Sequence, residues 1–191
     1  MSCAPIVAVA AICNGHKGIG KNKDLPWPFL KEDHEFYTGL CKTTKDPKKK
    51  NGIITGRVGW EGWSEEKKTD PKITTVVISK SLPKDEPHCR GVARSFEEAI
   101  NMLSSGPDKD KIETIYNIGG RLNYEHSVSD VRCKKLVLTR IFQDFESDVY
   151  FPDFEHAFER VSDPEIDDRI REDPSSKIKF RFEVWVRKSD Q

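Results

Sequence analysis

A tryptophan between two prolines, followed closely by two acids, is the most specific chemical feature of the sequence. The segment 24–28 reads DLPWP, so the prolines fix a rigid turn and present the flat side chain of Trp27. Glu32 and Asp33 follow at the start of a predicted helix. A carboxylate beside an aromatic wall can hold an amidine-like ligand edge by two parallel hydrogen bonds. The same acids could instead only favour the helix dipole, and the residues alone leave both interpretations open.

Gly119 and Gly120 stand between an apolar run and a predicted helix. Adjacent glycines let the backbone approach a phosphate at a helix N-terminus, where free N–H groups favour an anion. A plain tight turn is the alternative. The segment 18–20 (GIG) lacks the third glycine of a dinucleotide fingerprint, which disfavours a standard Rossmann dehydrogenase.

Three basic residues, Arg57, Lys80 and Arg94, lie at or near the ends of predicted strands. In an α/β sheet such positions face the ligand crevice. Each residue alone could be a solvated surface cation. Together they resemble a site for a cofactor that carries phosphate groups.

Short apolar runs, most of them rich in β-branched residues, predict the strands. Most are apolar on both faces, as buried parallel strands are, whereas the last alternates like a half-buried strand and predicts an antiparallel edge or hairpin. The predicted strands are 6–12, 52–55, 73–79, 114–118, 135–141 and 177–186.

Helices are predicted between these strands, at 31–41, from Ser95 onward and at 122–128. Ser95 and Glu98 have the spacing of a capping box. The polar segments 42–51 and 163–176 are predicted to be loops. The alternation of strands and helices predicts an α/β fold: one domain over residues 1–191, with a central, mostly parallel twisted sheet, an antiparallel C-terminal strand and flanking helices.

The overall composition excludes several classes of protein. The 191 residues carry a formal net charge of +0, which argues against a general nucleic-acid binder. No segment approaches the roughly 18 apolar residues of a membrane span, and the apolar start of the chain is expected to be a core strand and not a signal peptide. The five cysteines form no CxxC pair, which predicts free thiols in the cytosol. Because the histidines and cysteines are scattered, no metal site is expected.

The whole chain resembles the dihydrofolate reductase family, in its animal-type, monofunctional form. Several distinctive segments occur in the order and spacing of that family. They are GIGKNKDLPWP (18–28), ITGRVGW (54–60), VVISKS (76–81), ARSFEEAI (93–100), YNIGGRLNY (116–124) and LTRIFQDFESDVYFP (138–152).

This resemblance implies an enzyme that transfers a hydride from nicotinamide C4 of NADPH to C6 of 7,8-dihydrofolate, with protonation at N5. The product, tetrahydrofolate, would supply one-carbon metabolism and thymidylate synthesis. The resemblance further implies a cytoplasmic monomer that antifolates inhibit and that needs neither nucleic acid nor a membrane. Two alternatives are a pyrimidine-type reductase of riboflavin synthesis, which should lack the LPW turn and the helix acid, and a non-catalytic folate-binding protein.

In the site that the resemblance implies, Asp33 is the essential acid, Thr139 bonds the same pterin edge and Trp27 orients a water. Glu32 is the runner-up for the acid, and it would bring Phe36 into contact with the ligand in place of Tyr37. The further substrate contacts are Leu25, Glu32, His34, Phe36, Tyr37, Trp63, Lys72, Ile118 and Tyr124. The implied cofactor contacts are Ala11 (or Ala10), Ile19, Gly20, Gly56, Arg57, Val58, Gly59, Ser79, Lys80, Ser81, Arg94, Gly119, Gly120, Arg121 and Leu122.

The sequence departs from the family pattern at three positions. Ile73 stands where the family usually has an arginine that grips the substrate's α-carboxylate, and Lys72, with two further lysines nearby, is the expected replacement. A lysine cannot form the bidentate fork of an arginine, so tail binding is expected to be weaker or rerouted. Gly59 replaces a hydroxyl residue. His34 puts a titratable ring at an apolar position, where it either packs as a neutral ring or makes ligand affinity depend on pH.

Overall fold

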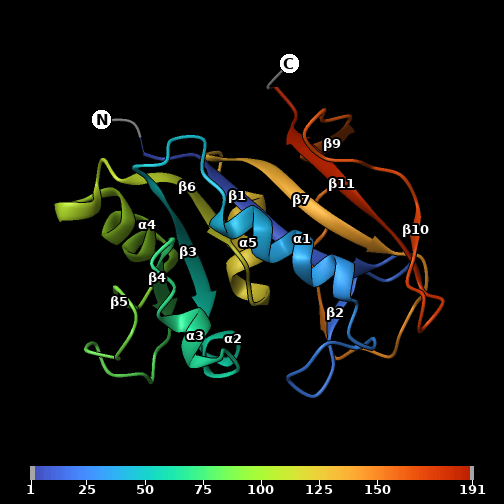
Figure 1. Ribbon diagram of the computed structural model, residues 1–191, viewed down its shortest axis with the longest axis horizontal. Helices are drawn as coiled ribbons and strands as arrows, with labels where there is room; N and C mark the ends of the chain where they lie inside the picture. Colours follow the sequence, from blue (N-terminus) through green and yellow to red (C-terminus); the bar gives the residue numbers. More distant parts are fainter. Residues whose placement is uncertain (1–2, 190–191) are drawn as a thin grey trace.

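The computed structural model describes residues 3–189, whose main feature is a large twisted sheet (Figure 1). Its hydrogen-bonded order is β10-β11-β7-β1-β6-β3-β4-β5, and β9 also pairs with β11. A separate small sheet joins β2 to β8. The strands are β1 (Ile6–Cys13), β2 (Gly18–Gly20), β3 (Lys50–Gly56), β4 (Ile73–Ile78), β5 (Gly91–Ala93), β6 (Ile112–Asn117), β7 (Cys133–Ile141), β8 (Val149–Tyr150), β9 (Phe158–Val161), β10 (Arg171–Glu172) and β11 (Lys179–Arg187).

Helices cover both faces of the large sheet, with α1 in front and α5 behind in the view of Figure 1. None of the helices within residues 3–189 has the length and apolar character needed to cross a membrane. The helices are α1 (Lys31–Lys42), α2 (Arg57–Glu61), α3 (Glu65–Lys68), α4 (Phe96–Ser104), the 3₁₀ turn η1 (Gly106–Asp108) and α5 (Arg121–Ser129).

Strand β1 shows how one strand serves two cores. Ile6 and Ala8 pack in the cluster that contains the buried residues of α4 and α5. Val7 and Val9 point the other way and pack with residues of α1. Because successive side chains of a strand alternate between faces, a strand covered by helices on both sides must be apolar throughout.

The predicted fold class is confirmed, because β1, β3, β4, β5, β6 and β7 pair in parallel while β11 runs antiparallel to β7. The last strand forms an antiparallel hairpin with β10, as one of the two expected arrangements, but it does not lie at the edge of the sheet. Strands β9 and β10 both pair with the far side of β11. The predicted loop 163–176 therefore contains a strand, and the predicted loop 42–51 overlaps the end of α1 and the start of β3.

Helix α4 begins as the sequence predicts, because the Ser95 side chain accepts a hydrogen bond from the backbone N–H of Glu98 at 3.1 Å. The return bond differs from a standard capping box. The Glu98 carboxylate accepts the N–H of Arg94, one residue before the cap, at 2.5 Å. The predicted free thiols are also present, since all five cysteines are unpaired.

A buried acid on β11 was not foreseen from the alternating pattern. The Glu183 side chain is only 1% exposed. It accepts hydrogen bonds from Arg140 at 3.1 Å, Arg181 at 2.6 Å and the Trp185 indole at 2.9 Å. Burial by itself would raise the pKa of Glu183, but these three partners outweigh that effect and lower it.

We predict that Glu183→Ala lowers the free energy of unfolding by about 3 kcal/mol, because the substitution leaves Arg140 half-buried without its counter-charge. Chemical denaturation measures this change. Glu159→Ala on neighbouring β9 is the control, since Glu159 is exposed. The lowered pKa means that the contribution is complete above pH 4.5 and is lost as the pH falls further. Equal effects of the two substitutions would contradict this account.

Candidate active site

The centre of the candidate site is a hydrogen bond between α1 and β7. The Thr139 hydroxyl donates to the Asp33 carboxylate at 2.6 Å. Thr139 is buried in the middle of the sheet, opposite Ala11 on β1 and Phe182 on β11. Burial raises the pKa of Asp33, although the bond from Thr139 and the charge of His34 lower it in part. A desolvated carboxylate in this position is suited to bind a ligand edge that carries N–H donors.

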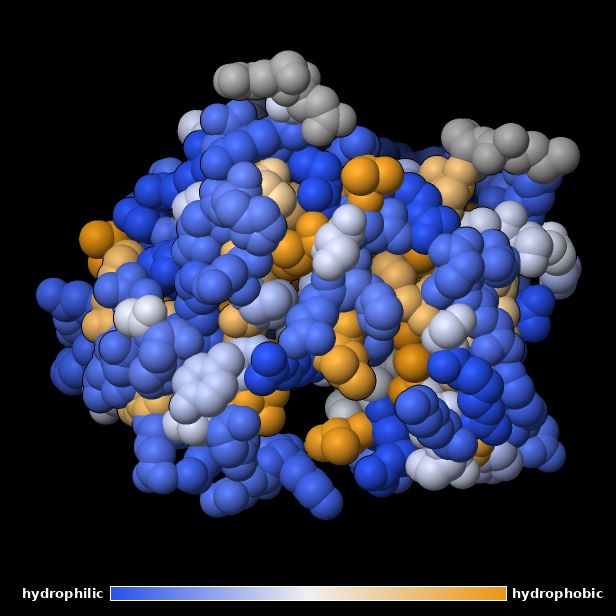
Figure 2. All heavy atoms as spheres, turned by 180° about the vertical axis from the view of Figure 1, so that it is seen from behind, coloured by the Kyte–Doolittle hydropathy of each residue, from blue (hydrophilic) through white to orange (hydrophobic). Residues whose placement is uncertain are grey.

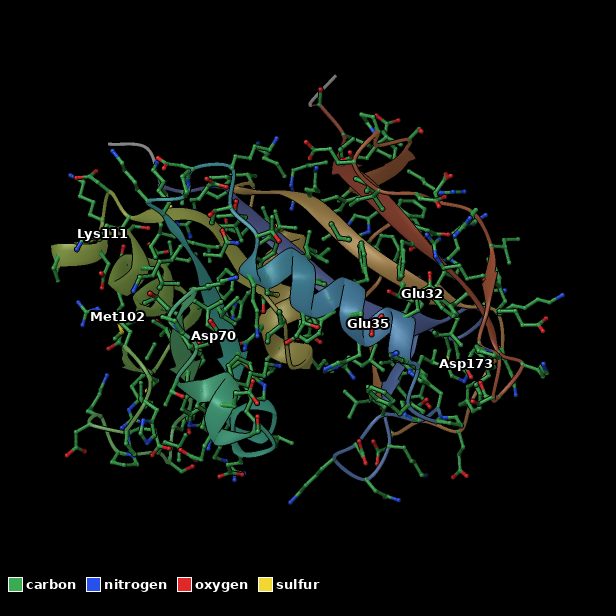
Figure 3. The ribbon with its side chains drawn as sticks, in the orientation of Figure 1. Glu32, Glu35, Asp70, Met102, Lys111 and Asp173 are labelled. Atoms are coloured by element: carbon green, nitrogen blue, oxygen red, sulfur yellow. The ribbon has the colours of Figure 1, made fainter. Side chains whose placement is uncertain are left out.

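The other helix acid has a different role. Glu32 is exposed and accepts a hydrogen bond from the Arg171 guanidinium at 2.6 Å, which ties α1 to β10. Figure 3 labels Glu32 and Glu35 on this helix. The structure therefore separates the two candidates, because Asp33 faces the sheet whereas Glu32 forms a surface ion pair.

The aromatic residues around Asp33 divide into two groups. Phe36 stacks on Phe182 with ring centroids 3.8 Å apart and fixes α1 against the sheet. Trp27 is buried and its ring meets the edge of Phe145. The indole Nε1 of Trp27 has no hydrogen-bond partner within residues 3–189. A buried indole N–H usually has a partner, so this donor fits a site that a polar ligand or water completes.

Farther along α1, Tyr37 accepts a hydrogen bond from Lys67 of α3, whose ammonium also lies over the ring of Trp63. His34 is exposed and packs its ring near Phe29 and Tyr37. The structure thus brings the predicted contacts Tyr37 and Trp63 together through a lysine.

The glycine pair forms a tight junction between two parallel strands. The N–H of Gly56, at the end of β3, donates to the carbonyl of Gly119 at 2.8 Å. Asn123 donates to the same carbonyl, and the Asn117 side chain accepts the N–H of Gly119. The N-terminus of α5 at Gly120 has no side-chain cap, and a Cβ added there would meet no atom within 4 Å. This backbone arrangement fits a phosphate of a bound dinucleotide.

Sequence analysis missed the buried asparagines that hold this junction. Asn117 also donates to the carbonyl of Asn123 at 2.6 Å and to the Ser127 hydroxyl at 2.7 Å. The predicted substrate contact Tyr124 lies beneath the junction, where its hydroxyl donates to the Val9 carbonyl at 2.8 Å. A Cβ on Gly119 would come within 2.8 Å of the Tyr124 ring.

Two of the predicted basic residues lie on the helices that follow these glycines. Arg57 pairs with Glu61 at 3.0 Å and Arg121 pairs with Glu125 at 2.7 Å, each one helical turn away. Both pairs are partly exposed, so water screens them and an anionic ligand can compete for the guanidinium groups.

A second basic group lies where β4 and β5 end. The Arg94 guanidinium donates to the carbonyl of Ser79. The buried Ser79 hydroxyl in turn accepts the N–H of Ser81 at 3.2 Å, which shapes the turn. Lys80, between the two serines, is exposed. The structure therefore brings these four predicted cofactor contacts together at the carboxyl edge of the sheet.

The rim of the site is unusually apolar. Leu25, Val58 and Leu122 are 49%, 43% and 69% exposed, and all three are predicted ligand contacts. Figure 2 shows a deep indentation at the lower edge of the molecule with hydrophobic residues along it. Exposed apolar side chains beside a hollow are typical of a ligand-binding groove. A separate hollow of about 340 Å³ lies between α4 and α5. None of the predicted ligand contacts lines it.

The loop that carries Ile19 and Gly20 is tied to the segment before β8. Gly20 pairs with Val149, and Lys21 forms an ion pair with Glu146 at 2.7 Å. The backbone N–H of Asn22 donates to Asp148 at 2.8 Å. These contacts hold the loop close to the predicted nicotinamide position.

The base of this loop contains a Cys13–His16–Asp144 cluster with donor atoms within 4.8 Å of one another, although these residue types are scattered in the sequence. Gly15 donates its N–H to Asp144 at 2.8 Å, and Gly18 donates its N–H to His16 Nδ1 at 3.0 Å. The cluster therefore serves the loop through its hydrogen bonds.

The remaining predicted contacts are more dispersed. Ile118 is half-buried just after β6, and its N–H donates to the Ile54 carbonyl at 3.0 Å. Lys72 is exposed directly before β4, and within residues 3–189 its ammonium forms no hydrogen bond or ion pair. The structure does not bring Lys72 into the group around Asp33.

Comparison with known proteins identifies the family of the chain. The sequence model described as dihydrofolate reductase matches residues 5–187. The chain belongs to the dihydrofolate reductase family.

Animal members of the family align with this chain over most of its length. The dihydrofolate reductase of Aedes albopictus is 31% identical over 93% of this chain and 94% of its own length. That of Drosophila melanogaster is 30% identical over 95% and 97%. That of Rattus norvegicus is 27% identical over 96% and 98%.

Two departures from the dihydrofolate reductase pattern have a structural basis. Ile73 is buried and packs in the cluster of α1, so this position belongs to the core. At Gly59 a Cβ would lie 2.8 Å from the hydroxyl oxygen of Thr55. Buried Thr55 therefore places a hydroxyl next to the position where the family usually has one.

The raised pKa of Asp33 predicts a cost to stability. Because folding disfavours the charged carboxylate, ionisation destabilises the native state as the pH rises above 3.8, the ordinary pKa. Asp33→Asn should therefore raise the free energy of unfolding of the ligand-free protein at pH 7 by about 0.5–2 kcal/mol. Denaturant unfolding measures the gain, and the exposed Glu35→Gln is the control. A gain that persists undiminished below pH 3.8 would exclude ionisation as its cause.

Proposed function

We propose that this chain reduces 7,8-dihydrofolate to 5,6,7,8-tetrahydrofolate with NADPH. The observation that carries the proposal is the half-buried Asp33 carboxylate, bonded to Thr139 in the middle of the sheet at 2.6 Å. It is supported by the family of the chain and by the names of its animal relatives. On this proposal residues 1–191 act as one domain, in the cytosol and as a monomer.

On this proposal Asp33 accepts two parallel hydrogen bonds from the amino group and ring N–H of the pterin. Thr139 keeps the carboxylate in place and contacts the same pterin edge. The negative charge makes the bound ring more ready to gain a proton at N5. The unpaired Nε1 of Trp27 donates to a water near the pterin oxygen, and Leu25 and Ile118 form apolar walls that exclude bulk water.

The residues at the carboxyl edge of the sheet fit NADPH. The uncapped N-terminus of α5 and the junction of Gly56 with Gly119 fit its pyrophosphate, and the turn of Ser79, Lys80 and Arg94 fits the 2′-phosphate of its adenosine. When bound, NADPH supplies the hydride that C6 of the pterin accepts. The loop of Ile19 and Gly20 covers the nicotinamide.

We predict that Asp33→Asn lowers kcat for dihydrofolate by about 10²–10⁴-fold at pH 7, because the pterin loses its charged partner. The loss of NADPH absorbance with dihydrofolate measures turnover. NADPH binding, followed by fluorescence, should change less than about twofold.

The two neighbouring acids test the assignment. Glu35→Gln changes an exposed residue of the same helix and should retain wild-type turnover. If Glu32→Gln, and not Asp33→Asn, greatly lowered kcat, Asp33 would not be the pterin-binding acid. Absence of NADPH oxidation by the wild-type protein at micromolar concentration would refute the proposed activity.

The choice between NADPH and NADH tests the basic turn. Lys80→Gln should raise the KM for NADPH by about tenfold, the loss of one charge-assisted bond, and leave the KM for NADH unchanged. Lys84→Gln removes a nearby lysine that is paired with Glu98 at 2.6 Å, and it serves as the matched control. If Lys80→Gln changed the KM for NADPH and the KM for NADH equally, Lys80 would not bind the 2′-phosphate.

A further inference from the structure

Lys67, in the last turn of α3, has an unusual environment for a surface lysine. Its ammonium nitrogen donates a hydrogen bond to the Tyr37 hydroxyl at 2.9 Å. The same nitrogen lies 4.0 Å from the ring centroid of Trp63 and 4.7 Å from that of Tyr37. Two aromatic side chains thus surround a cation, which they attract through their ring faces.

No carboxylate accompanies this cation in the described part of the chain, although the neighbouring lysines have one. Lys68 lies 3.8 Å from Glu65, and Lys42 forms an ion pair with Asp70 at 2.6 Å. Figure 3 labels Asp70. Lys67 is partly buried, and among residues 3–189 only Tyr37 accepts a hydrogen bond from its ammonium. An ammonium has three N–H donors, so a bound anion could accept the remaining bonds.

The position of Lys67 relative to Asp33 indicates which anion could reach it. Tyr37 follows Asp33 by one helical turn on α1, a rise of about 6 Å along the axis. Both residues lie on the same side of the helix, because positions four apart share a face. A ligand whose ring is held by Asp33 and whose side arm runs along α1 would therefore bring its far end to Lys67.

We propose that Lys67, held between Tyr37 and Trp63, binds a carboxylate of the glutamate tail of the substrate. This inference rests on the proposed function, because dihydrofolate supplies the tail. It replaces the assignment of the tail to Lys72, whose exposed ammonium is solvated and contacts no residue of the site. It also explains how the chain binds an anionic tail although Ile73 is part of the core.

The site has a pH dependence that a solvated lysine would not give. Burial lowers the pKa of Lys67 to about 8; the charge of Lys42 lowers it further, and Cys41 opposes these effects in part. Two groups near Lys67 keep their charge state in this range, because burial raises the pKa of the Cys41 thiol to about 12 and that of the Tyr37 hydroxyl well above 10. Lys42 forms an ion pair with Asp70 at 2.6 Å. Lys67 is therefore the group that loses its charge as the pH rises through 8.

The test compares dihydrofolate with 6-methyl-7,8-dihydropterin, which has the same ring but no tail. Lys67→Met keeps the length of the side chain and removes its charge. We expect it to raise the KM for dihydrofolate roughly tenfold, with kcat and the KM for the tail-free pterin within about twofold of wild type. Lys67→Arg should keep most of the affinity for the tail. Lys68→Met, on the same helix, is the matched control, because Lys68 lies over Trp60 and near Glu65.

A second measurement uses the wild-type protein, so it does not depend on how a variant folds. The ratio of the two KM values, dihydrofolate over tail-free pterin, should rise about tenfold between pH 7 and pH 9.5. A lysine in water titrates near pH 10.4, so a tail bound by a fully solvated lysine would give a nearly flat ratio over most of this range.

The outcomes separate this inference from the proposed function. If the protein oxidised NADPH with neither pterin, the proposed function would fail and this inference with it. If it reduced both pterins, but Lys67→Met changed both KM values equally or neither, the site at Lys67 would be refuted alone. The site at Lys67 would also be refuted if Lys72→Ala selectively weakened dihydrofolate binding and the ratio of the two KM values did not change with pH. In that case Lys72 would be the residue that binds the tail.

Discussion

The arrangement of the site depends on one unfavourable requirement: a carboxylate must be kept out of water without an ion pair. Asp33 is held by a hydroxyl from the middle of the sheet, and burial raises its pKa. This is possible because the stack of Phe36 on Phe182 fixes α1 against β11 and so aims Asp33 at Thr139. Most of the neighbouring packing can be understood as support for this single group, since a loosely held acid would turn to solvent.

Local sequence patterns were enough to predict the long strands of the central sheet and the three longer helices, but not the short elements between them. Continuous β-branched runs specify strands that are buried on both faces, and Ser95 with its hydroxyl specifies the start of α4. Asp33 and Glu32 could not be separated in this way, because adjacent helix positions differ by about 100° and both suit a first turn. Which acid faces the sheet is decided by the docking of α1, a contact between residues far apart in the sequence.

The features that the sequence did not reveal are all long-range polar contacts. Glu183 occupies an alternating position that predicts exposure, yet it is buried and hydrogen-bonded to Arg140 and Arg181. Asn117 is buried next to a glycine pair whose shape it controls. Lys67 and Lys72 have similar local contexts, and only the approach of α3 to α1 gives Lys67 its aromatic surroundings. Such contacts depend on tertiary packing, which residue periodicity does not encode.

The loop that carries Ile19 and Gly20 is held largely by ion pairs at the surface. Its lysines pair with acids of the opposite segment, Lys17 with Asp153 at 2.6 Å and Lys21 with Glu146 at 2.7 Å, and these acids are exposed. Charges at a surface are screened over about 8 Å at physiological ionic strength, whereas apolar packing is not. Dissolved salt thus weakens the attachment of this loop, while the apolar interior keeps its shape. The firmness of this one attachment therefore depends on ionic strength more than the stability of the apolar core does.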